Sequence, residues 1–209
     1  KKAVAVTLPL GKEQELHGYV DLVKMKAYEY KGVDTPDLVE VDIPEDMQDI
    51  VAQRREELVE ILAEQDDALM EKFFAGEELT TEELYAALRK GTLASEIFPV
   101  LGGDSRTAMS KTLLDYITIC LPSPLDKPAV KGINPKNNEQ VERETSENAP
   151  FSSLVFKIVN DAHIGNLSYF RVYSGKIAAG SYVLNSTKGI KERVSRLILM
   201  HADEREEVD

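Results

Sequence analysis

The stretch FSSLVFKIVNDAHIGNLSYFRVYSGKIAAGSYVLNS, residues 151–186, decides the fold of the C-terminal part of the chain. Its first segment alternates apolar Leu154, Phe156 and Ile158 with polar neighbours, and this period of two is typical of a half-buried β-strand. Glycine-containing turns interrupt the alternation at 165–166, 175–176 and 180–181. The pattern predicts three strands of an antiparallel meander from a small β-barrel, followed by a fourth strand over 190–200.

The N-terminal part mixes strands and helices. Residues 3–30 alternate as strands, and an apolar stripe with helical spacing predicts a helix from Pro44 to about residue 65. Thr80 and Glu83 have the spacing of a capping box at the start of another helix. A buried strand over 97–101, a glycine loop and a helix over 107–121 follow in the order of an α/β nucleotide-binding domain. That last helix is expected to turn its larger apolar residues inward: Leu113, Leu114, Ile117 and Cys120.

Charge and cysteine content limit the possible functions. The 209 residues carry a formal net charge of -12, with 37 acidic and 25 basic residues. Such a balance argues against a protein that coats nucleic acid by bulk charge, but it allows a local basic patch. One cysteine excludes an internal disulfide and fits a reducing compartment. No apolar run approaches the roughly 20 residues of a membrane span, so no membrane partner is expected.

Several long, ordered segments resemble elongation factor G, a translational GTPase. In the C-terminal part these are Phe156–Ile158, Gly165–Leu167, Phe170–Gly175, Met200–Ala202 and Arg205–Val208. In the N-terminal part they are His17–Val23, Glu71–Lys72, Gly76–Thr80 and Leu121–Pro124.

The resemblance implies an α+β chain with four parts. Residues 1–96 would be an insert subdomain of the GTPase domain, and 97–124 its last strand and helix. Residues 125–150 would be a linker, and 151–209 the first part of the second, β-barrel domain. The absence of a start methionine and the abrupt ends favour an internal fragment of a longer cytoplasmic protein.

The implied parent moves messenger and transfer RNA on the ribosome with GTP and Mg²⁺. Two alternatives stay open: a ribosome-protection or release-type GTPase, and a non-catalytic ribosome-binding regulatory module. Neither the G-x-x-x-x-G-K-[ST] phosphate loop nor the Asn-Lys-x-Asp guanine motif occurs in the 209 residues. We therefore expect this chain to hold no catalytic residue and to bind no GTP by itself.

One nucleotide-facing element remains in the resemblance, the loop Gly102, Gly103, Asp104 and Ser105. The family places a Ser-Ala pair there, whose backbone helps to hold guanine, and this pair is missing. Either the parent is a divergent paralogue with altered nucleotide affinity, or the loop is a tolerated variant that uses only backbone groups.

Two charged clusters are candidate partner surfaces. Glu56, Glu57, Glu60 and Glu64 form an acidic helix face, which the resemblance makes a candidate contact for the ribosomal stalk protein; the alternative is a solvated helix face. Lys188, Lys191, Arg193 and Arg196 gather around the predicted fourth strand, where the resemblance suggests ribosomal RNA; the alternative is an exposed polar strand. No metal site is expected, because His17, His163 and His201 lie far apart in sequence. Incomplete closure of the barrel would leave open strand edges, so self-association is a further expectation.

Overall fold

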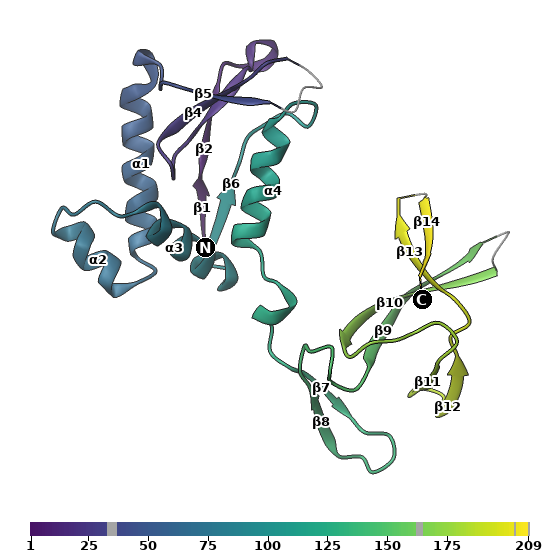
Figure 1. Ribbon diagram of the computed structural model, residues 1–209. Coiled ribbons are helices and arrows are strands. Elements are labelled where there is room, and N and C mark those ends of the chain that lie inside the picture. The colour runs from purple at the N-terminus through teal and green to yellow at the C-terminus, as the bar shows by residue number, and fades with distance from the viewer. Residues whose placement is uncertain (33–36, 162–164, 203, 209) are drawn as a thin grey trace. The chain divides into compact units, whose positions relative to one another are not determined.

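The computed structural model of the chain describes residues 1–32, 37–161, 165–202 and 204–208. It divides into two compact units, unit 1 from Lys1 to Leu121 and unit 2 from Pro122 to Asp209. Helices and strands are mixed, and the strands form several small sheets, so the fold is α+β (Figure 1).

Unit 1 holds all the α-helices of the described residues. Its strands are β1 (Lys2–Ala5), β2 (Thr7–Leu10), β3 (Gly18–Asp21), β4 (Lys26–Tyr30), β5 (Leu38–Val41) and β6 (Ile97–Val100). Its α-helices are α1 (Gln48–Ala63), α2 (Asp67–Phe74), α3 (Thr81–Leu93) and α4 (Met109–Cys120). Short 3₁₀ turns, η1 (Glu13–Glu15) and η2 (Glu45–Met47), precede β3 and α1.

Two sheets meet at Val6 in unit 1. Strands β1 and β6 pair in parallel, with Lys2 opposite Ile97 and Ala5 opposite Val100. Strands β2, β3, β4 and β5 form an antiparallel sheet in that order. Between β1 and β2, the Val6 N–H donates to the Val100 carbonyl and the Val6 carbonyl accepts from Leu22 N–H, both at 3.0 Å. The two sheets are thus joined through one residue.

A continuous apolar core fills unit 1. It joins residues of both sheets to α1, α3 and α4, and its fully buried large side chains are Leu10, Leu22, Leu58, Leu62, Leu84, Leu88 and Ile97. Burying one leucine of this kind stabilises the fold by about 1.5–3 kcal/mol. Glycine is required at position 18, because a Cβ there would lie 2.2 Å from the Tyr28 carbonyl oxygen on the neighbouring strand.

Local helix signals are confirmed. Thr80 accepts from Glu83 N–H at 3.2 Å, and the Glu83 carboxylate accepts from Thr80 N–H at 2.9 Å, which completes the predicted capping box of α3. Of the predicted stripe of α1, Val51, Leu58 and Leu62 are buried, Met47 and Ile61 are half-buried, and Ile50 is 38% exposed.

The predicted inward face of α4 is wrong. Cys120 is buried, but Leu113, Leu114 and Ile117 are 48%, 61% and 42% exposed. The buried stripe of this helix is Met109, Thr112, Tyr116 and Cys120. Polar Thr112 and Tyr116 lie inward because partners on β3 satisfy their hydroxyl groups, as described below.

Unit 2 consists of paired strands. The hairpins are β7 (Val130–Ile133) with β8 (Gln140–Arg143), β9 (Ser152–Asp161) with β10 (Gly165–Ser174), β11 (Tyr182–Asn185) with β12 (Ile190–Arg193), and β13 (Leu197–His201) with β14 (Glu204–Val208). A 3₁₀ turn, η3 (Pro124–Asp126), opens the unit. Each pair is antiparallel, and the described residues contain no closed barrel.

The strand count predicted after residue 150 is too low. The three strands expected within 151–186 are present, but the single fourth strand over 190–200 is two strands, β12 and β13, and β14 follows. Strand β11 pairs with β12 and not with β10, so the meander is interrupted. The break follows Gly175, whose φ of +70° and close approach to Phe151 turn the chain away after β10.

Burial is sparse in unit 2. Among its described residues only Leu197 and Ser174 are buried. The apolar row Leu154, Phe156 and Ile158, predicted to be half-buried, is 55%, 64% and 66% exposed. The alternation therefore predicted the strand correctly but not its burial. A register shift between Tyr169 and Phe170 also places Ile158 opposite Ser168 and Leu154 opposite Arg171, so the row does not stay on one face of the hairpin. The expected self-association stays a prediction.

Candidate functional site

The loop after β6 forms one wall of a small hollow in unit 1. The hollow has a volume of about 230 Å³. It is lined by Thr7, Tyr19, Leu101, Gly102, Gly103, Asp104, Ser105, Met109, Ser110, Thr112 and Leu113. All four residues of the predicted nucleotide-facing loop thus line it, together with β2, β3 and α4.

Internal hydrogen bonds shape this loop. Gly102 N–H donates to Thr7 Oγ1 at 3.2 Å, which ties the loop to β2. The Asp104 carboxylate accepts from Arg106 N–H at 2.7 Å, and the Asp104 carbonyl accepts from Thr107 Oγ1 at 3.1 Å. Because the Asp104 side chain already accepts a hydrogen bond within the loop, it is held in an Asx turn at the start of α4.

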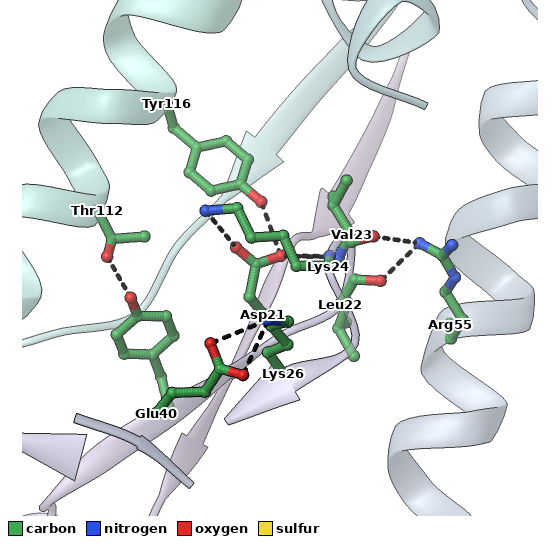
Figure 2. Close-up of polar contacts among 10 residues, drawn as sticks. Asp21, Leu22, Val23, Lys24, Lys26, Glu40, Arg55, Thr112 and Tyr116 are labelled. Atoms are coloured by element: carbon green, nitrogen blue, oxygen red, sulfur yellow. Dashed lines mark hydrogen bonds and ion pairs between the residues drawn. The ribbon is translucent and has the colours of Figure 1, made fainter. Parts of the chain in front are cut away.

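A buried carboxylate anchors the end of β3 (Figure 2). Asp21 is 1% exposed, and its Oδ1 accepts from the N–H groups of Val23 and Lys24, each at 2.9 Å. The Tyr116 hydroxyl of α4 donates to the same oxygen at 3.3 Å. Lys24 Nζ lies 4.0 Å from the other oxygen. A buried charge is tolerated only with partners of this kind.

Two further contacts join β3 to helices on different segments. The Tyr19 hydroxyl hydrogen-bonds the Thr112 hydroxyl of α4, next to the hollow. Arg55 of α1 donates from Nη1 to the carbonyls of Leu22 and Val23, at 2.7 and 3.0 Å, as Figure 2 shows. The end of β3 therefore fixes α1 and α4 relative to the antiparallel sheet.

Burial is the main cause of the shifted pKa values in and around this cluster. Burial, and then the negative charge of Asp21, raises the pKa of Tyr116 far above its usual range. The same two causes raise the pKa of Tyr85 to about 12. Burial also raises the pKa of Tyr19 and lowers that of Arg55. The Tyr116 phenol therefore stays protonated to a higher pH than a free tyrosine and donates to Asp21.

The four basic residues predicted as a partner surface lie on and beside the β11–β12 hairpin of unit 2. Lys191 faces Leu184 and Arg193 faces Tyr182 across the pair, so both cations share one face with an aromatic ring. Lys188 lies in the turn, where its N–H donates to Asn185 Oδ1 at 3.0 Å. Arg196 lies in the connection to β13. All four are exposed.

Comparison with known proteins finds a family match over part of the chain. Residues 150–209 match a family model described as elongation factor G domain 2. The chain is elongation factor G-like. Its fold is similar to the crystal structure of a Thermus thermophilus protein, ttk003000868, with a TM-score of 0.73 and 25% sequence identity. That similarity covers 99% of this chain, and the chain spans 28% of the length of the Thermus protein.

The region that matches domain 2 of elongation factor G contains hairpins β9–β10, β11–β12 and β13–β14. The stretch with which the sequence argument began therefore lies within the matched region, as do all four basic residues. The loop at 102–105 and the acidic helix lie outside it, in unit 1.

Two of the four predicted glutamates of α1 have partners within the chain. Glu57 accepts from Arg54 at 2.7 Å and from Gln53 at 3.0 Å, and these bonds, in that order, lower the pKa of Glu57. Glu64 pairs with Lys2 Nζ at 2.6 Å. Glu56 and Glu60 are exposed and have no ion-pair partner within the described residues. They are one helical turn apart, so the free acidic surface consists of these two.

No metal centre is apparent in the part of the chain that the structure describes. There, no three His, Cys, Asp or Glu side chains gather as a ligand set. Of the three histidines, His17 lies in unit 1 near Glu29, His201 ends β13, and His163 lies outside the described residues. No described helix combines the length and apolarity that crossing a bilayer requires.

Sequence reasoning missed the cluster around Asp21. A local signal existed, because Asp21 interrupts the apolar run from Gly18 to Val23. The partners Arg55, Thr112 and Tyr116 come from distant helices, however, and no spacing rule connects them to β3.

Proposed function

We propose that this chain is part of a GTPase that drives translocation of messenger and transfer RNA on the ribosome. The match of residues 150–209 to elongation factor G domain 2 carries this proposal. The similarity to the Thermus structure covers 99% of the chain, so both units share their fold with one known protein. A translation factor of this type works in the cytoplasm.

In this proposal GTP and Mg²⁺ are held mostly by residues other than those present here. The hollow beside 102–105 is proposed to take the base side of a nucleotide, since Leu101, Met109 and Leu113 line it with apolar side chains. Cations and N–H groups arranged for a triphosphate are missing, because the sequence has no phosphate loop. The role of the loop would be to position the base.

The loop leaves two readings of the parent open, a divergent paralogue and a tolerated loop variant. Residues 102–105 contain no Ser-Ala pair, and the Asp104 carboxylate accepts from Arg106 N–H within the loop. Nucleotide titration of the full-length protein tests this point. Weakened or altered guanine-nucleotide binding supports the divergent paralogue, and ordinary tight GTP binding supports a tolerated loop variant.

The proposed RNA contact is the exposed face with Lys191 and Arg193. Two cations at alternate positions of a strand point to the same side and can contact phosphates of ribosomal RNA. We expect that replacing both by glutamine weakens binding of the chain to small ribosomal subunits roughly tenfold at low salt. Co-sedimentation measures this. The matched control replaces Lys131 and Lys176, which are paired with Glu142 and Glu147, by glutamine. A wild-type chain that does not sediment with the subunits would contradict the proposal.

The proposed contact for the stalk protein is Glu56 with Glu60 on α1. Complementary charge at an exposed surface mainly raises the association rate and depends on salt. Reversing both charges to lysine should slow association with the purified stalk protein. Reversing Glu57 and Glu64 is the control, because these two already pair within the chain. Equal association rates for the first variant and the wild type would remove this contact.

A further inference from the structure

A threonine of the antiparallel sheet holds the first residue of the loop 102–105. Thr7 is 6% exposed, and its Oγ1 accepts from Gly102 N–H at 3.2 Å. Just before this contact, the Val6 N–H donates to the Val100 carbonyl at 3.0 Å. The chain therefore leaves β6 attached to the start of β2, first by a backbone hydrogen bond and then by a side chain.

The strand that carries Thr7 is fixed at the same level. In the β2–β3 ladder Thr7 lies opposite Asp21. Asp21 is the buried carboxylate that accepts from the N–H groups of Val23 and Lys24 and from the Tyr116 hydroxyl. Because the neighbouring strand is anchored at this point, the Thr7 hydroxyl is presented to the loop from a fixed position.

The far end of the loop is attached to the same sheet. The Asp104 carboxylate accepts from Arg106 N–H in the Asx turn that leads into α4. Helix α4 is bonded to β3 through the hydroxyl groups of Thr112 and Tyr19, and both of these residues line the hollow. The loop thus lies between two attachments, one on β2 and one, through α4, on β3.

The backbone at the start of the loop borders open space. A Cβ at Gly102 would meet no atom of the described residues within 4 Å, and the φ of Gly102 is not positive. Neither crowding nor a left-handed backbone therefore requires glycine there. A residue without a side chain lets a ligand approach the backbone closely. The attachments of the loop then decide where that backbone lies.

We propose that Thr7 is a positioning residue for the base side of the nucleotide, because its hydroxyl fixes the backbone of the loop at Gly102. This inference rests on the proposed function for the ligand, a guanine nucleotide, and adds a residue outside the loop to that site. Thr7 acts through Gly102. A loop that is already held by a hydrogen bond loses less conformational entropy when it binds, so its affinity for the base is higher.

The first test measures whether the hydrogen bond holds the loop in solution. Thr7→Val keeps a β-branched side chain in the strand but removes the acceptor. Gly102 is exposed, so water can accept from its N–H and the fold is expected to persist. In hydrogen exchange of the 209-residue chain, followed by NMR, the Gly102 amide of this variant should exchange about fivefold faster, the effect of one hydrogen bond.

Two further variants serve as controls. Thr7→Ser keeps the hydroxyl group, so its Gly102 amide should exchange like that of the wild type. Thr92→Val removes a threonine hydroxyl elsewhere in unit 1, one that donates to the Leu88 carbonyl within α3 at 2.7 Å. This variant should leave the exchange of Gly102 unchanged.

The second test measures the affinity of the full-length protein for fluorescently labelled GDP. Thr7→Val should weaken binding about fivefold while the denaturation midpoint stays close to that of the wild type. Thr7→Ser should restore the affinity, and Thr92→Val should not change it. A merely structural role of Thr7 would instead lower the denaturation midpoint without a separate loss of affinity.

Three results would overturn the inference. The first is unchanged exchange of Gly102 in Thr7→Val. The second is faster exchange of Gly102 with unchanged affinity for GDP. The third is a loss of affinity that Thr7→Ser does not restore. Failure of the proposed function is distinguishable, because the wild-type full-length protein would then bind no GDP; that result would remove the positioning role as well, whatever the exchange of Gly102.

Discussion

Unit 1 and unit 2 have similar shares of regular structure but differ in how much apolar surface they bury. Residues 1–121 bury a continuous set of leucines and valines between two sheets and three helices. Residues 122–209 form hairpins that leave Leu154, Phe156 and Ile158 more than half exposed. Hydrogen bonds of a hairpin cost little to make locally but contribute little net stability, whereas buried apolar area is the main favourable term in folding. The difference implies that unit 1 has the larger free energy of unfolding, while most side chains of unit 2 lie at the surface.

The largest expected effect is the difference in stability loss between truncating a core leucine and truncating an exposed one. Leu88→Ala should lower the free energy of unfolding of unit 1 by about 3 kcal/mol, because it leaves a cavity in a closed core. Leu154→Ala should change stability by less than about 0.5 kcal/mol, since its side chain is 55% exposed. The stability of unit 1 is measured by denaturant titration followed by the helical circular dichroism signal, because the α-helices of the described residues lie in this unit. The effect of Leu154→Ala is measured by hydrogen exchange of β9 and β10. A large loss on Leu154→Ala would mean that the β9–β10 face is covered in solution.

Removal of the buried Asp21 carboxylate has the next largest expected effect on stability. Asp21→Ala should destabilise unit 1 by about 2–3 kcal/mol, because the N–H groups of Val23 and Lys24 and the Tyr116 hydroxyl lose their acceptor. The exposed carboxylate of Glu71 on α2 provides the control, and Glu71→Ala should leave stability unchanged within about 0.5 kcal/mol. Equal effects of the two substitutions would show that the cluster does not hold β3 against α4.

Alkaline pH should weaken unit 1 specifically. The folded-state pKa of Tyr116 is raised above the ordinary tyrosine value of about 10. Unfolding then releases a proton at high pH, so stability is complete below about pH 10 and falls as pH rises above it. Tyr116→Phe should flatten this fall without abolishing it, since the pKa values of Tyr85 and Tyr19 are raised as well. Denaturant titrations on both sides of pH 10 measure the slope, and the same slope in the variant would contradict the assignment.

A helix cap gives the smallest expected effect. Thr80→Ala removes the acceptor for Glu83 N–H at the start of α3 and should cost about 1 kcal/mol. Thr80→Ser keeps the hydroxyl group and should restore most of this loss. If Thr80→Ala left the midpoint of the helical transition unchanged, α3 would be held by its buried leucines alone.

These contrasts also explain what could be predicted from the sequence. The cap at Thr80, most of the stripe of α1 and the three strands within 151–186 depend on residues close in sequence, and these were predicted correctly. The orientation of α4 depends on Tyr19 and Asp21, which lie 93 and 95 positions from Thr112 and Tyr116. Apolar content alone therefore put Leu113 and Leu114 on the wrong side.

In the candidate site too, features that depend on neighbouring residues could be predicted, and features that depend on distant residues could not. The loop 102–105 was predicted as nucleotide-facing and does line a hollow, but the hollow is completed by Thr7 and Tyr19 from far upstream. On α1, the pairing of Glu64 with Lys2, 62 positions away, could not be predicted from the helix alone. In both cases the composition of the segment indicated its character, but its contacts with distant residues could not be predicted from the sequence.

Hydrogen exchange of the 209-residue chain tests the division between the units most directly. The account predicts strong protection of β3, α1 and α3 and weak protection of β9 to β12. Strong protection of β9 to β12, or weak protection of β3, α1 and α3, would contradict it.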